Sequence, residues 1–117
     1  MIYELCKIHT YLTDEDIQKL ASIAKDLPLI ADLLQADIFI DCMTKDPNVA
    51  IVVAEAKPSN FPSMYQQSVV GEFALRKNEP AILRTLEIGM PTRDLRAITQ
   101  ENKSVKQNVV PIKNNSS

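Results

Sequence analysis

Apolar residues recur at helical spacing in the first third of the chain. They lie three or four positions apart, which predicts one apolar stripe of an amphipathic helix. The stripe consists of Ile17, Leu20, Ala24 and Leu27. Thr13 stands before three acidic residues, a pattern typical of a hydroxyl N-cap followed by carboxylates near the positive end of the helix dipole.

Proline at position 28 changes this picture, because it has no amide hydrogen for a helix interior. We expect the first helix to end there and Pro28, capped by Asp26, to open a second helix over 29–35. That second helix would carry a broad apolar face, made of Leu29, Ile30, Leu33 and Leu34. A further short helix is expected within residues 1–12, where apolar residues are less regularly spaced.

The period of the apolar residues changes after residue 35. Apolar and polar side chains alternate over 36–43, as they do in a strand. The run 49–56 is β-branched and nearly continuously apolar, which predicts a strand buried on both faces. Because the Lys-Asp-Pro-Asn sequence at 45–48 favours a turn, we expect the two strands to pair as a hairpin.

The second half of the chain mixes helical and strand signals. We expect the Val-Val-Gly sequence at 69–71 to turn the chain into a short helix containing 73–75. Asn78-Glu79-Pro80 predicts the start of a helix, and Gly89 predicts its end, because glycine adopts the left-handed conformation without strain. Residues 92–104 are expected to form a short strand or loop and a polar turn, and 105–112 another strand.

This order of elements predicts an α+β fold, with a central antiparallel sheet flanked by helices. We expect a single domain over 1–112, helical in 1–35 and made of sheet and helices in 36–112. Residues 113–117 would be a polar tail or a truncated turn. A strand that ends in an open turn leaves a sheet edge unpaired, so we also expect the chain to lack the last strand of its fold.

Composition excludes several classes of function. The chain has 13 Lys and Arg against 15 Asp and Glu, which argues against nucleic acid or an anionic membrane as its main partner. Its two glycines stand far apart, which excludes a P-loop and a dinucleotide fingerprint. Two cysteines and one histidine are too few for a disulfide framework or a zinc site, so we expect reduced thiols, no metal and no cofactor.

No apolar run in the sequence reaches the length needed to span a bilayer, and the N-terminus lacks the pattern of a signal peptide. We therefore expect a cytoplasmic protein.

Three segments resemble a known family: LIADLLQADIFIDC, VVGEFALRKNEPAILRTLEIGMPTRDLRAIT and VKQNVVPIKN. Their most specific parts are Asn78-Glu79-Pro80, Gly89-x-Pro91-x-Arg93-Asp94 and the late Val-Pro-Ile at 110–112. On these motifs the chain resembles the N-terminal sensor domain of cytoplasmic bacterial two-component histidine kinases. The resemblance implies a GAF-like fold and a sensory role without catalytic residues in the chain itself.

The same resemblance implies how the parent protein would work. A small cytoplasmic ligand would bind this domain and modulate autophosphorylation of a downstream kinase core, in many relatives through a PAS domain. The partner would be a response regulator, which in many relatives acts by RNA-binding antitermination. The ATP-binding chemistry would lie outside these residues, because two isolated glycines cannot form its glycine-rich boxes.

Polar residues of the two predicted strands are the candidate ligand-binding groups. Phe39 and Asp41 share one strand face, and Glu55 is the one charge inside the apolar run 49–56. Our hypothesis is that the two carboxylates, with Tyr65 from the following loop, face a pocket for a small polar or cationic ligand. The alternative places Asp41 at the end of the hairpin and Glu55 at a solvated edge.

Arginines offer a second kind of site. Arg93 follows Gly89 and Pro91 in a tight segment, where it could clamp an anion or hold its own loop through Asp94 or the backbone. Arg76 and Arg84 are expected on exposed helical surface.

Two other classes of function stay open. A GAF-type thiol redox enzyme would need an accessible thiolate with a resolving thiol in reach. Cys42 shares a strand face with apolar residues, which predicts a buried side chain, and Cys6 lies outside the sheet region. A ligand-free dimerisation module would use the apolar stripe of residues 17–27 as the seam of a homodimer. The same stripe is more simply the core face of the helix.

Overall fold

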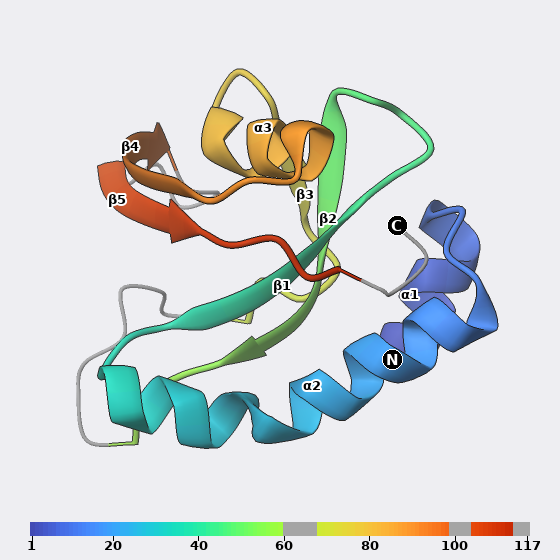
Figure 1. The fold of residues 1–117 in the computed structure, drawn as a ribbon, viewed down its shortest axis with the longest axis horizontal. Helices are drawn as coiled ribbons and strands as arrows, with labels where there is room; N and C mark the ends of the chain where they lie inside the picture. Colours follow the sequence, from blue (N-terminus) through green and yellow to red (C-terminus); the bar gives the residue numbers. More distant parts are fainter. Residues whose placement is uncertain (60–67, 99–103, 114–117) are drawn as a thin grey trace.

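The computed structural model describes residues 1–59, 68–98 and 104–113, with the backbone alone described in 92–98 and 104–109 (Figure 1). Its elements are α1 (Ile2–His9), α2 (Asp14–Leu34), β1 (Ile38–Met43), β2 (Val49–Ala56), β3 (Phe73–Leu75), α3 (Pro80–Ile88), β4 (Thr92–Ile98) and β5 (Ser104–Val109). The strands form an antiparallel sheet in the order β1-β2-β3 and a separate antiparallel pair, β4-β5. The predicted α+β class is confirmed.

The start of α2 agrees with the sequence. The side chain of Thr13 accepts a hydrogen bond from the amide of Asp16, and the carboxylate of Asp16 accepts one from the amide of Thr13. This reciprocal pair is a capping box, which satisfies two amides that the helix itself leaves without acceptors.

Replacing Thr13 by alanine is expected to lower the free energy of unfolding by about 1 kcal/mol, because the amide of Asp16 loses its acceptor. Urea unfolding measures this change. The matched control is Thr13→Ser, which keeps the hydroxyl and should cost clearly less. Equal losses in the two variants would show that the cap itself contributes nothing.

The predicted break at Pro28 is wrong, because α2 is one continuous helix of 21 residues that includes Pro28. Proline lacks the amide that would bond the carbonyl of Ala24, so the helix loses one backbone hydrogen bond there. Leu27 and Ala31, on either side, are both buried in the same apolar cluster. We attribute the continuous helix to this packing, which outweighs the local preference of proline.

Continuity of α2 also overturns the apolar face expected over 29–34. Leu29, Leu33 and Leu34 are 62%, 73% and 64% exposed, and only Ile30 packs against the core. In one uninterrupted helix the buried stripe runs through Ile17, Leu20, Leu27 and Ala31. At about 100° per residue, Leu29 and Leu33 therefore point away from this stripe. Leu34 lies on the same side as Leu27, but it is the last residue of α2 and stays exposed. The stripe is the core face of α2, as its simpler interpretation held.

The predicted hairpin is confirmed, since β1 and β2 pair antiparallel and β2 has the predicted bounds. The short helix expected over 73–75 is wrong. These residues form β3, which pairs with the second edge of β2 and places Ala74 opposite Ala50. Both alanine side chains are fully buried. Pairing with a distant strand therefore decides the conformation of a segment whose own pattern is ambiguous.

Helices cover both faces of the three-stranded sheet (Figure 1). α1 and α2 pack on the first face, over a cluster that includes Ile40 and Cys42 of β1 and Ile51 and Val53 of β2. α3 packs on the second face, where Leu83 contacts the alanines of β2 and β3. The β4-β5 pair lies beside α3.

Both predicted ends of α3 are confirmed. Pro80 occupies the first turn, and Gly89 follows the last turn with φ 68°, in the left-handed region that favours glycine. Arg84 is exposed on this helix as expected. Arg76 is not helical, because it lies in the turn after β3. Its guanidinium binds both carboxylate oxygens of Glu87, at 2.8 and 2.7 Å, and also the carbonyl of Pro47.

Several expectations lie beyond what the structure tests. The domain bounds 1–112 and the further strand after this chain stay predictions. The expected polar turn falls largely on 99–103, and most of the polar tail on 114–117, both outside the described residues. Within the described ranges, no helix combines the length and the apolarity that crossing a membrane requires.

Candidate functional site

A bulge in the β1-β2 hairpin sets which side chains share the second face of the sheet. Ile40 pairs with Ala54 and Asp41 pairs with Val52, so Val53 has no partner on β1. Val53 and Ala54 both pack toward α1 and α2, whereas Val52 packs on the second face. The extra residue therefore turns Glu55 to the second face, where it lies opposite Phe39.

Asp41 occupies this face in an unfavourable environment for a charge. The residue keeps some accessible surface, but its carboxyl group is enclosed by protein atoms. Burial, with a smaller effect from the negative charge of Glu79, raises the pKa of Asp41 to about 7. Among the residues whose side chains the structure describes, 1–59, 68–91 and 110–113, no hydrogen bond or ion pair reaches this carboxyl group. Asp41 is therefore poised between its neutral and ionised forms near neutral pH.

Glu79 is the acidic neighbour that the sequence did not identify as part of this site. It precedes α3 and is 5% exposed, and its amide bonds the carbonyl of Leu75 at 2.9 Å. The positive end of the α3 dipole favours a carboxylate at this position. In the sequence, Asn78-Glu79-Pro80 indicated only a helix start, and no local signal reveals that α3 carries Glu79 toward β1.

Phe39 and Glu55 border the same region. Phe39 is partly buried and packs against Val52 and Val69. Glu55 is also partly buried, and its carboxylate accepts a hydrogen bond from the amide of Val69 at 3.4 Å. Glu55 therefore holds the segment that leads into β3. The structure brings Phe39, Asp41 and Glu55 to one face, which is the arrangement that the pocket hypothesis needs.

The structure does not describe the side chains of the two other predicted site residues. Tyr65 lies outside the described residues. Arg93 falls in β4, so its backbone belongs to a strand and not to the tight loop that the sequence indicated. Its side chain lies outside the description.

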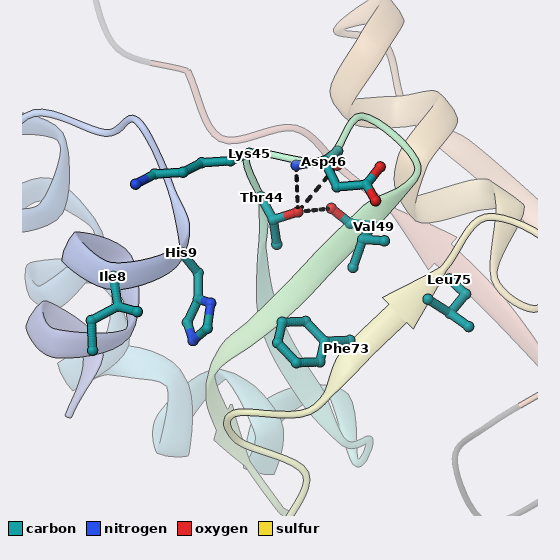
Figure 2. Close-up of a pocket in the computed structure, with 8 residues that line it drawn as sticks. All are labelled: Ile8, His9, Thr44, Lys45, Asp46, Val49, Phe73 and Leu75. Carbon is teal, nitrogen blue, oxygen red and sulfur yellow. Dashed lines mark hydrogen bonds between the residues drawn. The ribbon is translucent and has the colours of Figure 1, made fainter.

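A separate hollow opens on the other side of the β1-β2 turn (Figure 2). Its volume is about 370 Å³, and it lies between the end of α1 and the side chains of Phe73 and Leu75 of β3. The ring of His9 meets that of Phe73 edge-on, with 5.3 Å between centroids. Thr44 closes the turn above it, because its hydroxyl bonds the carbonyl of Val49 at 2.8 Å. This hollow is not lined by any of the three predicted site residues Phe39, Asp41 and Glu55.

Both cysteines are buried, as predicted for Cys42. Cys6 lies outside the sheet, in α1, as the sequence indicated, but its thiol forms a hydrogen bond with that of Cys42. This contact lowers the pKa of Cys6. It raises the pKa of Cys42, and burial and the charges of Cys6 and Asp41 raise that pKa further. In the part of the chain that the structure describes, no three His, Cys, Asp or Glu side chains gather as a metal site would require.

Comparisons with known proteins place this architecture in a class. Residues 2–117 match the family model described as histidine kinase PdtaS, GAF domain. Sheet, flanking helices and family match together define a GAF-type sensory domain of a sensor histidine kinase. The chain belongs to the family of histidine kinase PdtaS GAF domains, so the family resemblance seen in the sequence is confirmed.

Individual relatives agree with the family match. The sensor histidine kinase PdtaS of Mycobacterium tuberculosis, found in two strains, is 27% identical over 99 residues, which is 85% of this chain. The chain spans only 19% of the length of these relatives. A solved structure, described as the sensor region of a sensor histidine kinase, superposes with a TM-score of 0.70. It is 20% identical and aligns with 92% of this chain and 40% of its own, which shows the shared fold.

Proposed function

We propose that this sensory domain binds a small polar or cationic cytoplasmic ligand through the second face of its sheet. Asp41 carries the proposal, because its carboxyl group is enclosed beneath α3 with no described hydrogen-bond partner. A ligand that brings a positive charge or hydrogen-bond donors would stabilise the ionised form of Asp41. Phe39 would contact the apolar part of the ligand, and Glu55 would supply a second carboxylate.

Two more residues complete the proposed site. Tyr65 would contribute a hydroxyl from the segment after β2, and Arg93 of β4 would contact any anionic group of the ligand. Both assignments rest on the sequence alone.

The proposed signal is a change in how α3 packs on the sheet. Asp41 of β1 and Glu79 at the start of α3 repel each other when both are ionised. A cationic ligand between β1 and α3 would remove that repulsion and favour one packing of the helix. The effect on the equilibrium cannot exceed the difference in the ligand's affinity for the two packings.

In the parent protein this change would modulate autophosphorylation of a downstream kinase core, directly or through a PAS domain. A response regulator would receive the phosphoryl group, and the whole protein would work in the cytoplasm. The domain itself would carry no catalytic residue. A ligand-free homodimer is the alternative, and the exposed Leu29, Leu33 and Leu34 at the end of α2 are the observation that favours it.

A thermal-shift screen of small amines and polyamines tests the proposal. A ligand that binds only the folded chain raises the melting temperature by mass action. We expect such a compound to bind the Asp41→Asn chain at least about ten-fold more weakly, because loss of one charge-assisted hydrogen bond removes on the order of 1.5 kcal/mol or more.

The matched control is Asp26→Asn, which removes an exposed carboxylate of α2 and should leave the affinity unchanged. Equal binding to the wild-type and Asp41→Asn chains would place the ligand elsewhere. A screen without any hit, together with a dimer in analytical ultracentrifugation, would favour the interaction module.

A further inference from the structure

Two cysteines from elements far apart in the sequence meet in the core. Cys6 lies in α1 and is 0% exposed, and Cys42 lies in β1 and is 5% exposed. Both belong to the cluster between α1, α2 and the first face of the sheet, where their sulfur atoms are in hydrogen-bond contact. They are the only cysteines of the chain, so no other thiol of the chain competes for either.

Backbone contacts hold the two elements in this relation. The amide of Lys45, just after β1, bonds the carbonyl of His9 at the end of α1 at 3.0 Å. The buried hydroxyl of Thr10 bonds the carbonyl of Cys6 at 2.6 Å and so holds the last turn of α1. Because α1 is anchored beside the end of β1, the distance between the thiols is set by the fold and not by chance encounter.

We infer that Cys6 and Cys42 are a disulfide-forming pair, which oxidised glutathione or a similar low-molecular-weight disulfide converts reversibly into an intramolecular bond. The thiolate of Cys6 attacks one sulfur of oxidised glutathione and releases one glutathione thiolate. The thiolate of Cys42 then attacks the Cys6 sulfur of the mixed disulfide and releases the second glutathione. Two protein thiols are oxidised, one glutathione disulfide is reduced to two thiols, and the two protons pass to solvent or to the released thiolates.

The order of these steps follows from the environment of each sulfur. The hydrogen bond from Cys42 stabilises the thiolate of Cys6, whose pKa is lowered, so Cys6 is the better first nucleophile. α1 has only eight residues. Local opening of such a short helix is the route by which the oxidant reaches Cys6.

The bond would fix α1 covalently to β1. It closes the loop from Cys6 to Cys42, which restricts the unfolded chain and should raise the melting temperature on the order of 10 °C. The pair lies on the first face of the sheet, and the proposed ligand site lies on the second. The proposed disulfide and the proposed ligand site therefore do not depend on each other.

Equilibration of the 117-residue chain in glutathione buffers of graded ratio tests the inference. Samples are quenched in acid, their free thiols are alkylated, and the mass distinguishes two free thiols, the mixed disulfide and the intramolecular bond. We expect the equilibrium constant for the intramolecular bond to be at least about ten-fold higher in the native chain than in guanidinium chloride, by linkage to stability. Proteolysis should then yield one linked pair of peptides, containing Cys6 and Cys42.

Equal or lower constants in the native chain would overturn the inference, as would mixed disulfides alone or dimers whose amount rises with protein concentration. The variants Cys6→Ala and Cys42→Ala serve as controls, and each should give only mixed disulfide and no rise in melting temperature. Because both side chains are in the core, a variant that fails to fold does not weaken the test. The comparison of native and denatured wild-type chain decides it alone.

Discussion

Replacing Asp41 by asparagine is expected to stabilise the chain more and more as the pH rises from 4 to 8. The pKa of Asp41 is raised from an ordinary value of 3.8 to about 7, so the folded chain holds this proton more tightly than the unfolded chain. The contribution of the neutral carboxyl to stability is complete below about pH 4. It is lost progressively as the pH rises toward 7 and changes no further above that.

Asparagine is uncharged at every pH and keeps nearly the same shape. The free energy of unfolding of the variant, relative to wild type, should therefore grow by on the order of 3 kcal/mol between pH 4 and pH 8. Urea unfolding at a series of pH values measures the difference. Asp26→Asn is the matched control, because Asp26 is exposed on α2. The same trend in the control, or a flat difference at position 41, would contradict the burial of the Asp41 charge.

The second large effect is expected at Leu83. Its side chain is fully buried between α3 and the alanines of β2 and β3, so truncation leaves a cavity that rigid strands cannot close. We expect Leu83→Ala to lower the free energy of unfolding by about 3 to 4 kcal/mol. Denaturant unfolding measures the loss, and hydrogen exchange should show that the amides of α3 lose the most protection.

Leu86 is the matched control for Leu83, because the same helix leaves it 37% exposed. Leu86→Ala should cost less than about 1 kcal/mol. A conservative change, Leu83→Met, should cost under about 1.5 kcal/mol, since it keeps the volume of the side chain. Similar losses in both alanine variants would show that α3 gains its stability from the helix itself and not from packing on the sheet.

Parts of the fold were predictable because their cause is local. The capping box at Thr13, the left-handed end of α3 at Gly89 and the hairpin turn at 45–48 each depend on residues within a few positions. Alternation in 36–43 and the apolar run of β2 likewise indicate strands whatever lies around them. The sequence predictions failed where contacts with residues distant in the sequence decide the local conformation. Packing of Leu27 and Ala31 carries α2 through Pro28, and pairing with β2 makes residues 73–75 a strand.

The candidate site was likewise predictable only in part. Sequence alone identified Asp41 and Glu55 as unusual residues for their strands, because a charge in an apolar run needs a structural reason. It also placed Phe39 on the same face of its strand as Asp41, but it could not show that Glu55 shares this face. In a regular strand, Glu55 would point to the face opposite that of Val52, and the bulge at Val53 reverses this.

By itself, then, the sequence determined the class of the fold, the family, the start of α2, both ends of α3 and the residues that carry unusual charge. These follow from local backbone preference, from apolar period and from motifs that stand in one stretch of chain. Only the tertiary structure decided which of them meet. It placed Glu79 beside Asp41 and Cys6 against Cys42, because contacts across the sheet depend on how α1 and α3 pack. No spacing in the sequence records that packing.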